Sequence, residues 1–456
     1  MVNRFFKNDL VRAEEICGKS LADDPYAKSP YFHFTDWPVV AFDIDHTLAR
    51  YRLDNLHKLC YDLVVKFLVD KGYYSKETFR PFGELDLSYA QRGIYFYKRK
   101  GVFLKLDEEG NIVLAYSGTT LMDLNEALYK YAGSKELIAM KYDPFFREEG
   151  ADRNEEPVHC FDDFFTTGTI YLLMELVQKC IDEKDPDFEL PFKRIMEAYN
   201  FLFAKEDFAR GEGGFFSALK ENPSEYLYTL SSDFLQWLKT LKESKLALLI
   251  ITNSKADFAN FVLGFVIGED WRDYFDAVIT SAKKPHFFTL TVRNFYWLDG
   301  FEQGEVVKPG EYAKGREFCH GGFFNLKYII KAACGHMTPR MLFVGDNLVG
   351  DIYACHETMV CGVIGVVEEF GSERSSAWGP MLGTKSEPSF WRRKLEQWTT
   401  GIVSSVETLT RYKPDERIIY SSPEFHVFTY RYFKSDLPTR REKVPLVSAS
   451  KRQIAL

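Results

Sequence analysis

The sequence lacks the features that mark membrane, secreted or nucleic-acid-binding proteins. No apolar run approaches the ~20 residues that a membrane-spanning helix needs, and "MVNRFFKNDLVRAEE" has no apolar stretch of a secretory signal. The eight cysteines are scattered without a CxxC pair, which argues against a disulfide framework or a zinc site and favours reduced thiols in the cytoplasm. The formal net charge of −8 argues against nucleic acid or an anionic membrane as a partner.

The composition instead indicates a folded protein with large cores. Hydrophobic residues make up 46% of the chain and charged residues 27%, as in globular proteins. The 40 Phe and 26 Tyr are abundant, and aromatic side chains mostly fill cores and interfaces. At ~150 residues per domain, the 456 residues predict two to three domains.

Five short segments rich in Ile and Val predict an α/β fold. They are "VVAFDIDHTLARY" (39–51), "LALLIITNS" (246–254), "FDAVITSAKKP" (275–285), "RMLFVGDN" (340–347) and "CGVIGVVEE" (361–369). Continuous apolar runs of this length are typical of strands buried on both faces of a parallel sheet. Segments 255–268 and 325–335 carry apolar residues at helical spacing, and Gly335 suits a helix end. The alternation predicts a Rossmann-like parallel sheet.

The chain between the first and second strand segments is too long for a crossover. We therefore expect an inserted α+β domain at 56–240, and a discontinuous core made of 36–55 and 241–370. Within the insert we expect helices over 56–72, 168–184 and 191–205, a hairpin over 101–118 that turns at Glu109-Gly110-Asn111, and a polar loop over 147–158.

The sheet pattern ends near residue 370. We expect a helical extension over 371–433, with a helix over 388–412, followed by a basic, mobile tail at 434–456.

Polar side chains follow the strand segments where each strand should end. They are Asp43 and Asp45, Thr252 and Asn253, Lys283 and Lys284, and Asp346 with Asp351 shortly after it. The carboxyl ends of parallel strands form the ligand-binding edge of an open α/β sheet. Carboxylates bind a hard cation, and an ammonium and a hydroxyl neutralise phosphoryl oxygens. One aspartate can attack phosphorus while another transfers a proton, so this set predicts phosphoryl transfer.

The same residues form recognisable motifs. DxDxT after an apolar strand, a strand-end Thr, a Lys and GDxxxxD resemble the four motifs of the haloacid dehalogenase superfamily. The motif sequences are similar to those of the cytosolic 5′-nucleotidase branch and of the 5′-nucleotidase domain-containing proteins. They are "FDIDHTLARY", "ITNS", "AKKPHFF" and "FVGDNLVGDI". The resemblance covers roughly residues 36 to 370 and includes the "RG…GVFLKLDEEGNIVLAYSG" region.

The resemblance implies a role for each motif residue. Asp43 would be the nucleophile and Asp45 the proton donor. Mg²⁺ would be held by Asp43, the backbone carbonyl of Asp45 and Asp346, with Asp351 a further carboxylate at or beside the metal. Thr252, Asn253 and Lys284 would hold the phosphate of a small phosphorylated substrate, a nucleotide in the first instance. The insert would act as a cap that excludes water.

Several nearby residues have competing interpretations. Lys284 is preferred over Lys283 because it precedes Pro285, as the family's KP does, and Lys283 is expected to be solvated. His46 is expected to turn away from Asp45 by alternation along an extended chain. His320 and His356 are expected to be structural, and Arg210 is a weak candidate for a substrate contact.

The specificity residues of the family are not carried over. In purine nucleotidases an Arg and an Asp on one cap helix help to read the base, and Met196 and Asn200 stand there in this chain. Tyr199, Phe201 and Phe203 could stack on a base, although core packing is favoured.

Three functional classes therefore stay open: a Mg²⁺-dependent phosphohydrolase, a nucleoside phosphotransferase, and a non-catalytic phosphate-ligand-binding or regulatory protein. The intact Asp43/Asp45 pair favours an enzyme. Whether the protein forms a homo-oligomer is also left open.

Overall fold

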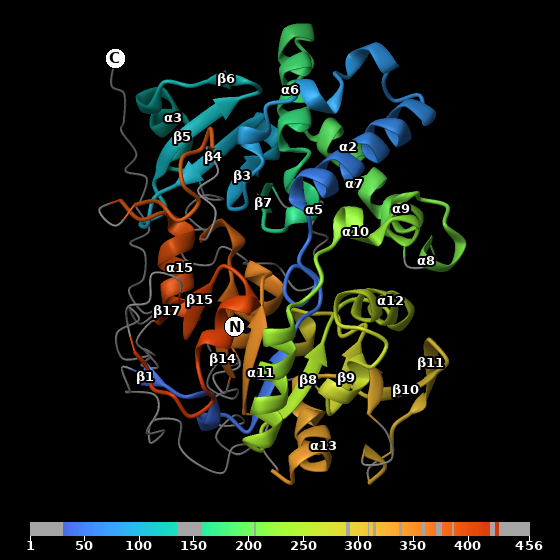
Figure 1. The fold of residues 1–456 in the computed structure, drawn as a ribbon. Coiled ribbons are helices and arrows are strands. Elements are labelled where there is room, and N and C mark those ends of the chain that lie inside the picture. The colour runs from blue at the N-terminus through green and yellow to red at the C-terminus, as the bar shows by residue number, and fades with distance from the viewer. Residues whose placement is uncertain are drawn as a thin grey trace, which may run out of the picture.

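The computed structural model describes residues 31–134, 157–204, 207–288, 292–308, 310–312, 316–336, 340–357, 361–370, 376–384, 387–419 and 425–427. Residues 147–156 of the expected loop and the expected tail at 434–456 lie outside these ranges. The described chain forms two layers (Figure 1). The lower layer in that view is a ten-stranded sheet with its helices, and the upper layer is a five-stranded sheet with its helices.

The large sheet is parallel through its centre. In spatial order its parallel strands are β12 (Glu317–His320), β9 (Ala277–Thr280), β8 (Ala247–Ile251), β2 (Val39–Phe42), β13 (Met341–Gly345), β14 (Cys361–Val366) and β15 (Gly401–Val403). Antiparallel strands β10 (Phe295–Asp299), β11 (Glu302–Val306) and β17 (Phe425–Val427) flank them. The short strands β1 (Tyr31–Phe32) and β16 (Ile418–Ile419) pair separately. The predicted mixed α/β fold with a largely parallel sheet is confirmed, and all five predicted strands lie in it.

Helices cover both faces of this sheet because its strands are apolar on both sides. Val40 and Phe42 of β2 belong to one buried cluster with residues of α11 (Ser232–Glu243) and α12 (Ala256–Val266). Val39 and Ala41 belong to a second cluster with α13 (Phe323–Cys334) and α15 (Phe390–Trp398). The helices predicted over 255–268 and 325–335 are confirmed, and α13 ends at Gly335, whose φ is 81°.

The predicted end of the sheet near residue 370 is wrong. The helix expected over 388–412 stops at Trp398, and Gly401–Val403 pairs with β14 as the parallel strand β15 before the 3₁₀ turn Val406–Arg411. Strands β12 and β10 were also missed. The three residues of β15 are too few to show a period, and β10 and β12 lack the Ile and Val runs of the predicted strands, so their pairing partners decide their conformation.

The second layer is an antiparallel sheet with helices. Its strands, in spatial order, are β6 (Thr120–Leu121), β5 (Ile112–Ser117), β4 (Val102–Leu106), β3 (Ile94–Tyr97) and β7 (Val158–Phe161). The predicted hairpin is confirmed as β4–β5, with Gly110 at a φ of 76°. The helices are α2 (Leu53–Asp70), α3 (Leu124–Tyr131), α5 (Phe164–Thr167), α6 (Ile170–Glu183), α7 (Glu189–Leu202), α8 (Asp207–Arg210), α9 (Phe215–Glu221) and α10 (Pro223–Tyr226), and α14 (Ala354–Glu357) belongs to the lower layer. The helices predicted over 56–72, 168–184 and 191–205 are confirmed as α2, α6 and α7.

Two chain passages that run side by side join the layers. The backbone N–H of Arg52 donates to the carbonyl of Tyr226 at 2.7 Å, and the N–H of Tyr228 donates to the carbonyl of Arg50 at 3.0 Å. In chain order, the strands and helices of the second layer lie between β2 and β8. The bounds of the inserted domain stay a prediction.

The C-terminal part of the chain provides a further attachment between the layers. The indole of Trp391 in α15 lies parallel to the ring of Tyr95 in β3, with 6.4 Å between ring centroids, while Trp398 at the other end of α15 packs with the parallel sheet. Lys105 of β4 donates to the backbone carbonyls of residues 378–380. The upper layer is thus held by more than its two linkers.

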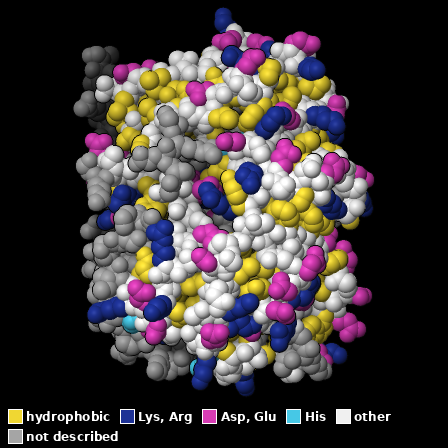
Figure 2. Space-filling view, in the orientation of Figure 1, with side chains coloured by type: hydrophobic (Ala, Val, Ile, Leu, Met, Phe, Trp, Pro, Cys, Tyr) yellow, Lys and Arg dark blue, Asp and Glu magenta, His cyan; other side chains and the backbone are white. Residues whose placement is uncertain are grey.

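The surface and the helices carry two further observations. Over the described residues, the face drawn in Figure 2 shows acidic and basic side chains interspersed, without a broad area of one sign. Among the helices that the structure describes, none is long and apolar enough to cross a membrane.

The packing of Trp391 on Gly93 can be tested with two alanine variants. A Cβ on Gly93 would lie 2.1 Å from Cδ1 of Trp391, whereas a Cβ on Gly72 would meet nothing within 4 Å, and both residues have positive φ. Gly72→Ala should cost ~1–2 kcal/mol of stability from backbone strain alone. Gly93→Ala should cost a further ~1–3 kcal/mol from overpacking. Equal thermal midpoints for the two variants would contradict the packing.

Candidate active site

The predicted strand-end residues converge at the carboxyl edge of the parallel sheet, below the second layer. The N–H of Asp43 donates to the carbonyl of Val344 at 2.9 Å, which extends the pairing of β2 with β13 by one residue. The N–H of Thr252 donates to the carbonyl of Ile279 at 2.9 Å and extends β8 along β9 in the same way. The sheet itself therefore positions these residues.

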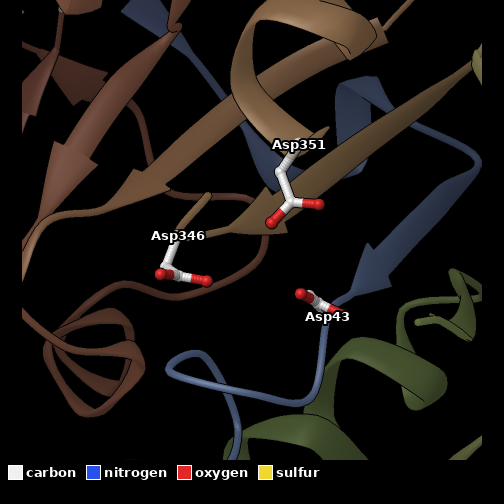
Figure 3. Close-up of side chains that lie close together, drawn as sticks. All are labelled: Asp43, Asp346 and Asp351. Carbon is white, nitrogen blue, oxygen red and sulfur yellow. The ribbon is translucent and has the colours of Figure 1, made fainter. Parts of the chain in front are cut away.

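Three aspartates form a buried acidic triad. Figure 3 shows the side chains of Asp43, Asp346 and Asp351 directed toward one another, and one carboxylate oxygen from each lies within 4.8 Å of the others. Their exposed fractions are 7%, 4% and 0%. A Cβ on Gly345 would lie 2.6 Å from Oδ2 of Asp351, so the glycine provides the space that this carboxylate occupies.

The ammonium of Lys284 joins two members of the triad. Its Nζ lies 2.8 Å from Oδ1 of Asp43 and 2.6 Å from Oδ1 of Asp351. The side-chain amide of Asn253 holds the lysine backbone, accepting from the Lys284 N–H at 2.6 Å and donating to its carbonyl at 3.0 Å. Lys283 is exposed, as expected. Asn253 thus supports Lys284, while its predicted phosphate contact stays a prediction.

Two hydroxyls orient Asp45. Tyr51 donates to Oδ1 at 2.7 Å and Ser254 donates to Oδ2 at 2.6 Å. Burial raises the pKa of Asp45, and the charge of Asp43 raises it further. The hydroxyl of the buried Thr252 accepts from the Ser254 N–H at 3.2 Å, which leaves its hydrogen available to a ligand. The roles of Tyr51 and Ser254 were missed, although Ser254 belongs to the strand-end run "TNS".

A guanidinium from the second layer also reaches the triad. Arg92, which directly precedes Gly93 and β3, is fully buried. Its Nη1 donates to the carbonyl of Asp346 at 3.0 Å and to its Oδ2 at 3.2 Å. Its Nε and Nη2 donate to the two carboxylate oxygens of Glu369, each at 2.8 Å. Sequence reasoning missed this contact because Arg92 and Asp346 are 254 positions apart.

His46 lies among aromatic rings rather than at the carboxylates. Its ring centroid is 4.6 Å from Tyr51, 5.0 Å from Phe164 and 4.7 Å from Phe165. Burial and then the charge of Arg92 hold its pKa well below the usual value, so the imidazole is neutral. The alternation argument for this residue was wrong, because its φ of 54° is left-handed and the chain is not extended there.

The other histidines and Arg210 lie elsewhere. Nδ1 of His320 is 3.0 Å from the carbonyl of Ser281 and Nε2 is 2.9 Å from Oε1 of Gln303, which fits the structural role expected of it. Burial lowers the pKa of His356 to about 4. Arg210 is exposed at the end of α8, and its substrate contact stays a prediction.

Helix α7 mostly packs in the core. The hydroxyl of the buried Tyr199 donates to a backbone carbonyl of α5 at 2.8 Å, and the ring of Phe203 stacks on that of Tyr199. Core packing, favoured from the sequence, is thus confirmed for Tyr199. Met196 is partly buried, whereas Asn200 and Phe201 are exposed.

The charges of the site are unbalanced in a way that fits a metal ion. The acidic groups are Asp43, Asp45, Asp346, Asp351 and Glu369, and the cations among them are Lys284 and Arg92. Burial raises the pKa of Asp346 and of Asp351, although a cation beside each opposes that shift. Carboxylate oxygens are the ligands that hard divalent cations prefer, so the donor set fits such an ion.

Comparisons with known proteins agree with the motifs. Residues 33–376 match the model of the 5′ nucleotidase family. The 5′-nucleotidase domain-containing protein 1 of Bos taurus is 28% identical over 395 residues, which cover 83% of this chain and 84% of that protein. The Homo sapiens protein of the same name is 29% identical over 377 residues, covering 80% and 79%. The 5′-nucleotidase domain-containing protein 2 of Rattus norvegicus is 26% identical over 322 residues, covering 70% and 54%. The likeness to 5′-nucleotidase domain-containing proteins is thus confirmed.

The need for space at Gly345 gives a test of the triad. Gly345→Ala should push the Asp351 carboxylate away and weaken binding of a divalent cation by roughly tenfold or more, since Asp351 holds Lys284, which in turn faces the Asp43 carboxylate. The control is Gly264→Ala in α12, where a Cβ would meet nothing within 4 Å and where alanine should stabilise the helix by about 0.5–1 kcal/mol. Titration calorimetry with Mg²⁺ and Mn²⁺ measures the difference. Unchanged affinity in Gly345→Ala would show that Asp351 does not shape the site.

Proposed function

Because this chain belongs to the 5′ nucleotidase family, we propose that it is a Mg²⁺-dependent phosphohydrolase that releases phosphate from a nucleoside monophosphate or a similar small phosphate monoester. The observation that carries the proposal is the buried triad with Lys284 bridging Asp43 and Asp351 at the strand ends. In this proposal the parallel-sheet layer is a haloacid dehalogenase core and the inserted layer is its cap. The scattered cysteines favour the cytoplasm as its compartment.

Asp43 is the proposed nucleophile. Its carboxylate attacks phosphorus, the bond from phosphorus to the ester oxygen breaks, and an aspartyl phosphate forms on Asp43. Water then attacks the same phosphorus, phosphate leaves, and the Asp43 carboxylate is restored. The Lys284 ammonium beside Asp43 and the Thr252 hydroxyl donate to the phosphoryl oxygens. A magnesium ion held by Asp43, Asp346 and the carbonyl of Asp45 would neutralise charge on those oxygens.

Asp45 is the proposed proton carrier. It gives its proton to the leaving ester oxygen in the first step and takes one from the attacking water in the second. Burial raises its pKa, which favours the protonated form that the first step needs. Tyr51 and Ser254 hold both of its oxygens, so its orientation is set before substrate binds.

Asp351 has a supporting role in this scheme. One of its oxygens faces Lys284 and the other accepts from the N–H of Asn347 at 3.1 Å. We therefore propose that Asp351 orients Lys284, and that Asp43 and Asp346 are the side-chain ligands of the metal.

The inserted layer would exclude water from the site and select the leaving group. Its Phe164 and Phe165 lie against His46, one residue from the proton carrier. The helix that would read a purine base carries Met196 and Asn200, so the substrate class is drawn as phosphate monoesters in general.

Carboxamide variants separate the two catalytic aspartates. A screen of nucleoside monophosphates and sugar phosphates with Mg²⁺ should identify a substrate, and chelation should abolish turnover. Asp43→Asn should form no phosphoenzyme. Asp45→Asn should turn over a natural ester ~10²–10⁴-fold more slowly, yet accumulate phosphoenzyme with an activated ester such as p-nitrophenyl phosphate, whose leaving group needs little protonation.

Intact-mass measurement reads the phosphoryl adduct directly. Asp62→Asn, an exposed position on α2, is the matched control and should behave as the wild type. An adduct on the Asp43 variant would reverse the assignment. Transfer to an added nucleoside in place of release to water would instead indicate a phosphotransferase, and full turnover in excess chelator would refute metal dependence.

A further inference from the structure

Arg92 links parts of the molecule that are far apart in the chain. It lies in the inserted layer, yet four of its hydrogen bonds go to residues that follow β13 and β14 of the parallel sheet. Its guanidinium carbon is 4.0 Å from the centroid of the Phe164 ring. The adjacent N–H of Gly93 donates to the carbonyl of Phe161 at 2.7 Å, so the backbone next to Arg92 is fixed to β7. A shift of the inserted layer would therefore move the guanidinium.

The contact with Asp346 has a particular geometry. One nitrogen, Nη1, reaches both the backbone carbonyl and one carboxylate oxygen of Asp346. Holding these two atoms at once restricts the side-chain torsions of the aspartate. The Asp346 side chain that is restrained in this way points toward Asp43 and Asp351 (Figure 3). The bidentate pair with Glu369 fixes the plane of the guanidinium, which a lysine could not do.

We propose that Arg92 is a positioning residue that makes assembly of the metal site depend on the seating of the inserted layer. The inference rests on the proposed function in one respect, since it requires the triad to hold a divalent cation. When the layer is seated, Arg92 holds Asp346 in the orientation that binds the ion. When the layer shifts, Asp346 loses that restraint and affinity for the ion falls.

Whether metal affinity rises or falls when Arg92 is replaced distinguishes a positioning role from a purely electrostatic one. A positive charge beside a metal ligand repels the metal ion, so removing it should strengthen metal binding if charge were the whole effect. Positioning predicts the opposite, because Asp346 loses the restraint that its two hydrogen bonds from Arg92 provide.

The turn after β14 supplies a matched control. Glu368, next to Glu369, pairs with Arg50 of the linker at 3.0 Å, and the Arg50 side chain is 46% exposed. Because the Arg50 end of this pair is in solvent, the pair is expected to contribute less to stability than a buried one. Arg50→Gln therefore removes an arginine that pairs with the same turn and does not contact the triad.

Metal affinity measured without substrate tests the proposal. In calorimetry with Mg²⁺ or Mn²⁺, Arg92→Gln and Arg92→Lys should each bind about tenfold or more weakly than wild type, and Arg50→Gln should bind as wild type. Arg92→Lys is expected not to restore the metal affinity, because lysine keeps the positive charge but lacks the planar guanidinium that donates two parallel hydrogen bonds. In deuterium exchange, the amides of 94–97 and of 341–345 should both exchange faster in Arg92→Gln.

A second variant keeps the proposal testable if Arg92→Gln fails to fold. Glu369→Gln keeps Arg92 and weakens its fixed plane, so it should lower metal affinity by less than Arg92→Gln does. Tighter metal binding in Arg92→Gln would overturn the inference, as would wild-type affinity in variants that merely melt at a lower temperature. If the wild-type protein binds no divalent cation, the proposed function fails together with this inference. If it binds one and Arg92 does not matter, the inference alone fails.

Discussion

Buried carboxylates repel one another, and this protein places four aspartates where four strand ends meet the π-helical segment Leu348–Tyr353 that follows β13. Two cations, Lys284 and Arg92, lie among them, and Arg92 is shared with Glu369. Bringing so many like charges out of water is unfavourable unless each is paired or coordinates a metal. Much of the surrounding structure can be understood as meeting that requirement. Asn253 holds the backbone of Lys284, two hydroxyls hold Asp45, and Gly345 leaves room for Asp351.

The sequence predicts the parallel sheet and its edge because both follow from local pattern. Runs such as Ala247–Ile251 are apolar on both faces, and the polar residues that follow them must lie at one edge. The hairpin β4–β5 was equally local, since Gly110 adopts a positive φ in its turn. Strand β12 was missed because Glu317 and His320 at its ends are polar, so its pairing with β9 and β10 identifies it. Strand β15 was missed because three residues cannot show a period.

The residues of the candidate site also fall into those that local sequence predicts and those that only the fold brings together. Asp43 and Asp346 could be predicted because each directly follows a strand, Asp45 because it belongs to the DxDxT motif, and Lys284 because it precedes a family-like Pro. Arg92 could not, because nothing local distinguishes it from other arginines and its partner is 254 positions away. Tyr51 and Ser254 lie near predicted residues, but their role depends on where the chain turns after His46, whose left-handed backbone no periodicity argument anticipates.

The ties between the layers bear on how a substrate can enter. A rigid-body opening of the inserted layer would break the Arg92–Glu369 ion pair and separate Trp391 from Gly93. It would also bend the two hydrogen-bonded chain passages that join the layers. Because these contacts would be lost together, the open form would be the less populated one. Local movement of side chains at the boundary of the layers requires none of these losses. Under the proposed function, a site reached in that way would favour small esters. Arg92 would keep Asp346 restrained while they exchange, so the same arginine would connect substrate size with binding of the metal ion.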